Sequence, residues 1–310
     1  MENISYTATK EDEGRYVKEI LQQKLKLSSR LIRKIKITGD IKLNGRDVHV
    51  RERVDTGDVV SVSYPEEQSY FEPEDIPIDV VYEDEDLLVI NKQAGLIVHP
   101  THNFPTGTLA NALTNYMNKR GDVYKLRFVN RLDMYTSGLI IVGKNAHCQD
   151  AIMNQMSANT IVKKYKAILH GVIDDDMTID LPIDKDPNHV ARRMVREDGY
   201  PSVTHVHVLE KYPDRTFGSI KGFSFVELKL DTGRTHQIRV HMTHIGHPLV
   251  GDELYAQLYG YSENPEWMPR QALHSYYLSF DHPVTGKRIE LETDVPDDMK
   301  SALKYIEAIE

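Results

Sequence analysis

The stretch from Val129 to Lys144 constrains the fold more than any other part of the sequence. Residues 139–142 form an uninterrupted apolar run between two glycines, which predicts a buried strand. The residues directly before this run are polar and include Arg131 and Asp133. A guanidinium and a carboxylate two positions apart, in a loop that leads into a buried strand, are typical of groups presented by a rigid scaffold. The simpler interpretation is a surface turn in which Asp133 stabilises a bend.

The segments around this stretch are rich in strands and contain few helices. This pattern favours an α+β fold with a mixed, mostly antiparallel sheet flanked by helices, over a regular series of parallel units. The expected elements are a hairpin over 78–92, helices that begin at Thr108 and Asn145, a strand over 160–169, a strand over 225–230, a strand over 272–280 and a final helix near Asp297.

Charge is distributed unevenly along the chain. The formal net charge of −9 argues against a nucleic-acid partner, but residues 24–53 contain ten basic and three acidic residues, a local charge of +7. An acidic stretch that contains prolines follows. We therefore expect a basic domain over 1–68, a linker over 69–75 and a second, larger domain over 76–310.

The basic domain is expected to contain two helices and a small sheet. Ser28 or Ser29 can cap the second helix, and Gly39 can end it. Asn44-Gly45 is a strong two-residue hairpin signal, with a returning strand at 48–50 and another strand at 59–62. The second helix carries a basic face that we expect to contact phosphates, unless it is an ordinary solvated surface. Its residues are Arg30, Arg33, Lys34 and Lys36.

This order of elements resembles a small RNA-binding domain found in a ribosomal small-subunit protein and in bacterial tyrosyl-tRNA synthetases. The match covers roughly residues 14–64, and Ser29-Arg30 with Asn44-Gly45 carry most of it. The resemblance implies that the basic face and Asn44 contact RNA.

A second polar concentration lies between residues 231 and 255 and contains four histidines within twelve residues. His241, His244 and His247 are three apart, a spacing that would align them roughly on one helical face and invites a metal-dependent hydrolase. The segment has no cysteine and no His-Glu-x-x-His pattern. The ordinary interpretation, loop histidines beside the start of a helix, is therefore favoured, and we expect no metal.

Other features argue against a membrane or secreted protein. No apolar run approaches the length of a membrane span, and the first residues lack a basic region followed by an apolar one. Cys148 is the only cysteine, which excludes an internal disulfide and fits a reducing compartment. We expect a cytoplasmic protein without membrane partners.

Four separated motifs together resemble one family, the RluA-type (RluA/RluD-like) pseudouridine synthases of ribosomal RNA. The match covers most of 78–291, and the motifs occur in the family's order. They are 91–96 with His99-Pro100, 131–139, 164–167, and 233–239 continuing to Gly251-Asp252. The small RNA-binding domain is also common ahead of this catalytic domain.

The resemblance implies a reaction and its residues. Uridine in RNA would be detached from its sugar, rotated and rejoined through carbon 5, without a metal, cofactor or energy source. Asp133 would be the catalytic carboxylate, acting on the base or the sugar, and Arg239 would keep it ionised. Tyr165 would lie beside the target base, and Leu273 would pack against it. Arg131 would reach into the RNA where the flipped base has left.

One position departs from the family pattern. Asn130 stands where the family usually has His, and we expect its amide to hydrogen-bond and cap the loop in the same way. The expected substrate is ribosomal RNA, with transfer RNA as the alternative, and the expected assembly is a monomer. A non-catalytic RNA-binding factor on the same fold is the second interpretation, and it would not need Asp133, Tyr165 and Arg239 together.

Overall fold

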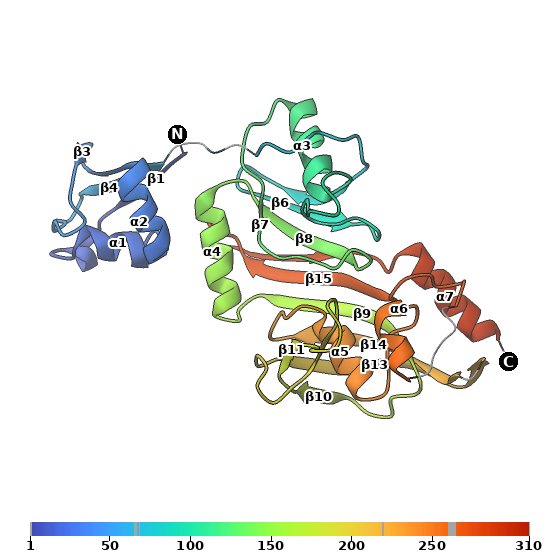
Figure 1. Cartoon of the computed structure of the whole chain (residues 1–310). Coiled ribbons are helices and arrows are strands. Elements are labelled where there is room, and N and C mark those ends of the chain that lie inside the picture. The colour runs from blue at the N-terminus through green and yellow to red at the C-terminus, as the bar shows by residue number, and fades with distance from the viewer. Residues whose placement is uncertain (1, 65–66, 68, 219, 260–264, 310) are drawn as a thin grey trace.

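The computed structural model describes residues 2–64, 67, 69–218, 220–259 and 265–309. Figure 1 shows a small domain at the amino terminus beside a larger unit built on one extended sheet. The predicted α+β class is confirmed, since both units combine sheets with helices.

The small unit contains a four-stranded sheet in the order β1-β4-β2-β3, with all pairs antiparallel. Its second helix begins after Ser28, whose side chain accepts a hydrogen bond from the Leu31 N–H, and ends at Gly39 as predicted. The predicted turn is also present, because Asn44 and Gly45 both adopt positive φ angles between β2 and β3. The elements are β1 (Glu2–Thr7), η1 (Lys10–Asp12), α1 (Val17–Gln23), α2 (Ser29–Thr38), β2 (Asp40–Leu43), β3 (Arg46–Asp47) and β4 (Val59–Tyr64).

Two details of the small unit differ from the sequence prediction. The strand β1 was not anticipated, and the returning strand expected at 48–50 is confined to Arg46–Asp47. The chain leaves the sheet there because Val50 turns inward and packs in the domain core.

The large sheet has ten strands, in the order β10-β13-β14-β9-β15-β8-β6-β5, with β16 paired to β15 and β7 paired to β8. Every pair is antiparallel except β15 with β8. The strands are β5 (Asp79–Glu83), β6 (Leu87–Lys92), β7 (Arg127–Phe128), β8 (Ser137–Gly143), β9 (Val162–His170), β10 (Met177–Asp180), β13 (Val203–Phe217), β14 (Ile220–Leu230), β15 (Leu273–Asp281) and β16 (Arg288–Glu292).

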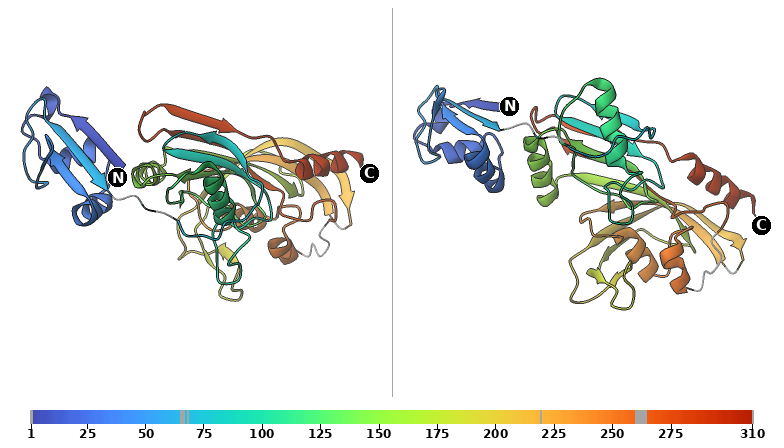
Figure 2. Two further views of the ribbon diagram at one scale, coloured as in Figure 1. Left: turned by 90° about the horizontal axis from the view of Figure 1, so that it is seen from above. Right: turned by 45° about the horizontal axis from the view of Figure 1, so that its top comes forward.

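Helices cover both faces of this sheet, and Figure 2 shows them from two further directions. Alternate residues of each strand face opposite sides, so Ile140 joins the core under α3 and α5, whereas Ile141 joins the core under α4. The helix α7 packs at the other end of the sheet from α4. The helices and the remaining short elements are α3 (Leu109–Arg120), α4 (Ala146–Ser157), β11 (Ile183–Lys185), β12 (Arg193–Val195), α5 (Gln237–His244), α6 (Glu253–Ala256), η2 (Gln257–Tyr259) and α7 (Asp297–Ala308).

The caps predicted for α3 and α4 are present. Thr108 accepts a hydrogen bond from the Asn111 N–H and Gly121 ends α3 in a left-handed conformation, while Asn145 accepts from the Cys148 N–H.

The segment that joins the two units makes contacts along the large one. The Leu126 N–H donates to the Ser69 hydroxyl, Phe71 packs against the main core, and the Glu74 carboxylate accepts from the Gly107 N–H. The amide of Asn111 donates to the Glu72 carbonyl. The domain boundaries at 68 and 76 remain predictions, and Phe71 is part of the larger unit's packing.

Candidate active site

Asp133 lies on a loop that precedes β8, and hydrogen bonds from Lys92 fix this loop. The ammonium of Lys92, at the end of β6, donates to the carbonyls of Gln93, Leu96 and Met134, each at 2.9 Å. The Met134 carbonyl also accepts from the Gly95 N–H. Burial lowers the pKa of Lys92 to about 7, and Arg270 adds to this effect, whereas the three carbonyl acceptors favour the ammonium form. The residue after Asp133 is thus fixed to the motif at 91–96.

The geometry at the start of β8 requires glycine at position 138, directly after the loop. Its φ is +116°, and a Cβ atom there would lie 2.2 Å from the carbonyl oxygen of Ser275 on β15. A side chain is therefore excluded. This close approach accompanies the single parallel pairing of the sheet, where Ser275 lies opposite Gly138, and it brings the loop against β15.

Arg239 contacts Asp133 as predicted. Its Nη1 lies 3.1 Å from Asp133 Oδ2, within the expected range for a direct ion pair. The other two nitrogens bind Asp252, with Nε to Oδ2 at 2.6 Å and Nη2 to Oδ1 at 2.8 Å. Burial opposes the charge of Arg239, but Asp252 and Asp133 together raise its pKa. Asp252, which lies before α6, therefore aims the guanidinium at Asp133.

His236 is a second polar neighbour of Asp133. Its Nε2 lies 3.7 Å from Asp133 Oδ2, and its Nδ1 lies 2.9 Å from the Tyr255 hydroxyl. The backbone of His236 is left-handed, with φ 58° and ψ 19°, directly before α5. Burial lowers the pKa of the imidazole, an effect that Asp133 opposes.

Tyr165 and Leu273 line a small cavity together with Asp133. The cavity measures about 70 Å³ and is also lined by Thr136, Leu230 and Ile238, among others. Tyr165 comes from β9 and Leu273 from the neighbouring strand β15, and both side chains are buried. Burial raises the pKa of Tyr165 to about 12, with a further contribution from the charge of Asp133, so the phenol is protonated at neutral pH.

The small cavity adjoins a much larger cleft of about 860 Å³. Five residues line both spaces, namely Arg131, Leu132, Asp133, His236 and Arg239. Arg131 is exposed, and within the described residues its guanidinium forms no hydrogen bond or ion pair, although its charge acts on nearby His99. The cleft is also lined by His99, His189, Arg192 and Arg270. Its four arginines outnumber its three carboxylates, which are Asp133, Asp252 and Glu253.

Arg270 is a site residue that the sequence analysis missed. It is buried, it donates to the carbonyls of Tyr135 (3.1 Å) and Leu273 (3.3 Å), and it forms a two-contact ion pair with Asp298 of α7. In the sequence, only its position three residues before Leu273 pointed to the site, because Tyr135 and Asp298 are distant from it along the chain. Arg270 and Lys92 together hold two successive carbonyls of the Asp133 loop.

Asn130 forms hydrogen bonds as expected, and they join the Asp133 loop to the edge of β8. Its Oδ1 accepts from the Ile141 N–H at 2.8 Å, and its Nδ2 donates to the Leu139 carbonyl at 3.2 Å. The amide supplies an acceptor and a donor to one strand at the same time.

The basic residues of the small domain are placed on α2, away from the Asp133 loop. Arg30, Arg33, Lys34 and Lys36 are all exposed. Lys34 forms an ion pair with Glu67, which also binds Lys125 and Arg127 of the large unit. The side chain of Asn44 is used within the domain, where it bridges Asp58 and the Val59 N–H. A role for these five residues in RNA binding remains a prediction.

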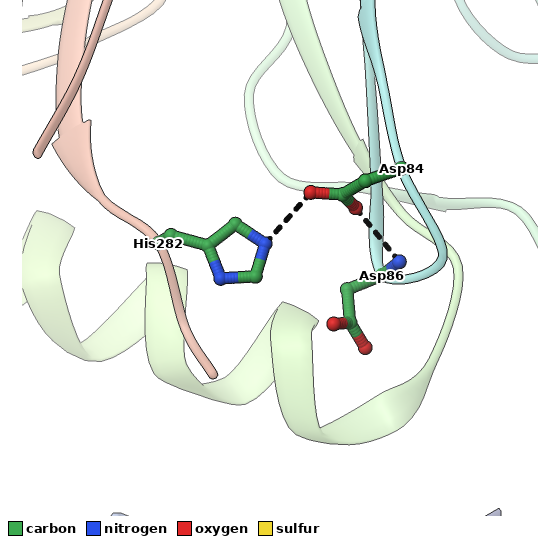
Figure 3. Close-up of side chains that lie close together, drawn as sticks. All are labelled: Asp84, Asp86 and His282. Atoms are coloured by element: carbon green, nitrogen blue, oxygen red, sulfur yellow. Dashed lines mark hydrogen bonds and ion pairs between the residues drawn. The ribbon is translucent and has the colours of Figure 1, made fainter. Parts of the chain in front are cut away.

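The histidines at 241, 244 and 247 do not converge. His241 is buried and hydrogen-bonds to Thr204 and to the Leu181 carbonyl, whereas His247 contacts the His170 carbonyl. Within the described residues, the group with the spacing of metal ligands is Asp84, Asp86 and His282 (Figure 3).

The Asp84 group is explained by hydrogen bonds. Asp84 accepts from His282 Nε2, from the Tyr82 hydroxyl and from the N–H groups of Asp86 and Leu87. These contacts tie the β5–β6 turn to the end of β15, which is a structural function.

Within the described ranges, no helix combines the length and the apolar character that crossing a membrane requires.

Comparisons with known proteins agree with this geometry. The family described as RNA pseudouridylate synthase matches residues 86–244. The chain is 40% identical over 275 residues to the "Uncharacterized RNA pseudouridine synthase YlyB" of Bacillus subtilis, covering 86% of each chain. It is 37% identical to the "Ribosomal large subunit pseudouridine synthase D" of Escherichia coli K12, covering 83% of this chain and 79% of the relative. The solved structure of human RNA Pseudouridylate Synthase Domain Containing 1 is similar with a TM-score of 0.57 and 26% identity, covering 75% of this chain and 95% of that one.

Proposed function

Because this chain belongs to the RNA pseudouridine synthase family, we propose that it isomerises uridine in large-subunit ribosomal RNA through the carboxylate of Asp133. The reaction breaks the bond between ribose C1′ and uracil N1 and forms a bond between C1′ and C5. The hydrogen on C5 leaves to water and N1 gains a proton, so the composition of the RNA does not change.

The observation that carries this proposal is the Asp133–Arg239 contact at the mouth of the small cavity. The ion pair places a positive charge against the carboxylate and orients it in a site partly withdrawn from water. Asp252 holds the guanidinium by two further bonds, so the arrangement is present before any substrate binds.

The two cavities suit the two parts of a flipped nucleotide. The small one suits the base, with Tyr165 and Leu273 against the uracil ring, and the larger cleft, with its four arginines, suits the ribose and the neighbouring phosphates. A protonated Tyr165 can donate a proton to the base but cannot accept one at neutral pH. Arg131 is exposed, and its proposed role is to enter the RNA as the base leaves the stack.

Two observations support ribosomal RNA as the substrate. Relatives 37% identical to this chain are named ribosomal large subunit pseudouridine synthases. The exposed basic face of α2 adds a second surface for a large structured RNA. A cytoplasmic location would follow from such a substrate.

The test is pseudouridine mapping of total RNA from cells with and without the gene. We expect one or a few positions in large-subunit ribosomal RNA to lose the modification and to regain it when the gene is restored. Loss confined to transfer RNA would contradict the proposed substrate, and no loss in any RNA would contradict the proposed function.

A further inference from the structure

The ring of His236 is held in one tautomer by a chain of three groups. The Arg193 N–H donates to the Tyr255 hydroxyl at 2.9 Å, and that hydroxyl lies 2.9 Å from His236 Nδ1. Within the described residues, Nδ1 is the one acceptor placed to receive the phenolic hydrogen. The phenol retains that hydrogen, because burial raises the pKa of Tyr255 to about 12. Nδ1 is therefore an acceptor, and the hydrogen of the neutral ring is on Nε2.

This Nε2–H lies near the Asp133 carboxylate but does not form a hydrogen bond with it. The 3.7 Å separation from Asp133 Oδ2 is too long for a hydrogen bond. His236 lines both the small cavity and the cleft. It thus lies where the base would meet the ribose, beside the bond that breaks.

His236 holds its ring in this position although its backbone is in the left-handed region. A left-handed backbone is unfavourable for a residue other than glycine. A side chain at this position before a helix often caps it, but His236 forms no such bond. The ring packs edge-on against Tyr255, with the ring centres 5.6 Å apart, so the conformation serves to direct the imidazole into the site.

We infer that the neutral Nε2–H of His236 donates a hydrogen bond to an oxygen of the target nucleotide beside the C1′–N1 bond, either uracil O2 or ribose O2′. The inference rests on the proposed function. His236 becomes a substrate-contacting donor, and Tyr255 becomes the positioning residue that fixes its tautomer.

The matched variants His236→Gln and His236→Met test the donor. Both side chains are unbranched and similar in length, and both meet the same left-handed backbone, but only Gln carries an N–H near the position of Nε2. The probe is total RNA from cells that lack the gene, labelled with tritium at uridine C5. We expect His236→Met to release tritium at least about tenfold more slowly than wild type in single turnover, and His236→Gln to stay within about threefold.

The outcomes separate this inference from the proposed function. Tritium release by wild type with equal rates for the Gln and Met variants would overturn the inference alone. No release by wild type would overturn the proposed function, and the inference with it. Equal melting temperatures of the two variants are the control for folding.

Tyr255→Phe gives a second readout, the dependence of the rate on pH, which would not change if Tyr255 had only a structural role. The groups that face the ring are Asp133, Arg239, Asp252 and Arg193, and they are unchanged in this variant. Without the hydroxyl, Nδ1 is easier to protonate, and a protonated ring would pair with Asp133. The acidic limb of the rate against pH should therefore move to higher pH in Tyr255→Phe and to lower pH in His236→Gln, whose side chain does not titrate. A uniform loss of rate with an unmoved limb would contradict the inference.

The acceptor is identified with a synthetic stem-loop that contains the mapped target uridine. If uracil O2 is the acceptor, 2-thiouridine at that position should abolish the difference between the Gln and Met variants. If ribose O2′ is the acceptor, 2′-deoxyuridine should do so. A difference that survives both substitutions would overturn the contact with the target nucleotide.

Discussion

At the scale of single residues, Asp252 determines where the guanidinium of Arg239 can point. It binds Nε and Nη2, which leaves Nη1 for Asp133. A lysine has one nitrogen in place of this planar fork and cannot bind both carboxylates in the same way.

We therefore predict that Arg239→Lys lowers the single-turnover rate by about 100-fold, close to the loss on removing a preorganised electrostatic group. Asp252→Asn should lower it by about tenfold, since the amide keeps one acceptor but loses the charge. Tritium release measures both. Arg288→Lys, which alters a partly exposed pair with Asp281 at the β15–β16 hairpin, is the matched control and should be neutral. Full activity of Arg239→Lys would show that the fork has no part in orienting Asp133.

The resemblance to the family predicted the contact between Asp133 and Arg239, whereas Lys92 and Asp252 belonged to the matching motifs without an assigned function. Their functions depend on carbonyls and guanidinium nitrogens that only the tertiary fold brings within reach. Arg270 was missed for the same reason, because its partners Tyr135 and Asp298 lie 135 and 28 positions away.

At the scale of elements, the adjacency of β9, β15 and β8 assembles the site. These three strands bring Tyr165, Leu273 and the Asp133 loop together. Between β15 and β8, His274 Nδ1 contacts the Ser137 hydroxyl at 2.9 Å, and its Nε2 contacts the Thr293 hydroxyl at 3.1 Å. Burial lowers the pKa of His274 to about 4, and Arg270 contributes.

This buried histidine predicts loss of stability in acid. An unfolded histidine has a pKa near 6.5, so between about pH 6.5 and pH 4 the unfolded chain binds a proton that the folded chain does not. The free energy of unfolding should therefore fall as the pH drops through this window, by up to about 3 kcal/mol from His274. Urea unfolding at pH 7 and pH 5 measures the change.

His274→Gln is the matched variant, because it cannot titrate. Its unfolding free energy should fall less between pH 7 and pH 5 than that of wild type, although buried His170, whose pKa burial also lowers to about 4, will leave some dependence. Equal falls in the two proteins would contradict the assignment.

Elements with strong local signals were predicted, and elements defined by their partners were not. Ser28, Thr108 and Asn145 cap helices whose starts can be read from single residues. The strand β13 was missed, since much of it is exposed and its register with β14 shifts twice. The position of such a strand is determined by its pairing with β14, and this pairing leaves no clear pattern in the local sequence.

At the scale of the whole molecule, the net charge of −9 conceals a basic segment at residues 24–53 of the small domain, whose local charge is +7. Each phosphate that the basic face of α2 neutralises should steepen the salt dependence of RNA binding by slightly under one log unit per tenfold salt. Lys34 is already paired with Glu67, so Arg30, Arg33 and Lys36 are the residues most available for this.

We predict that a chain beginning at Ser69 folds and keeps the Asp133 chemistry on saturating RNA. The start lies before Phe71, because that ring packs against the main core. Affinity for ribosomal RNA fragments should fall at least about tenfold, roughly 1.4 kcal/mol, and log affinity against log salt should be flatter.

The control is the full chain with Arg30, Arg33 and Lys36 changed to Gln, which keeps the small domain and removes three charges. It should flatten the slope in the same direction. If both proteins keep the wild-type slope, α2 is an ordinary solvated face and the cleft alone binds the RNA.

The most direct test of the central claim compares wild type with Asp133→Asn on total RNA labelled with tritium at uridine C5, taken from cells that lack the gene. We predict that Asp133→Asn releases no tritium in single turnover, while its affinity for the RNA stays within a few-fold of wild type. Asp214→Asn, which removes an exposed carboxylate of β13, should behave as wild type. Substantial release by Asp133→Asn would contradict the claim that this carboxylate carries the isomerisation.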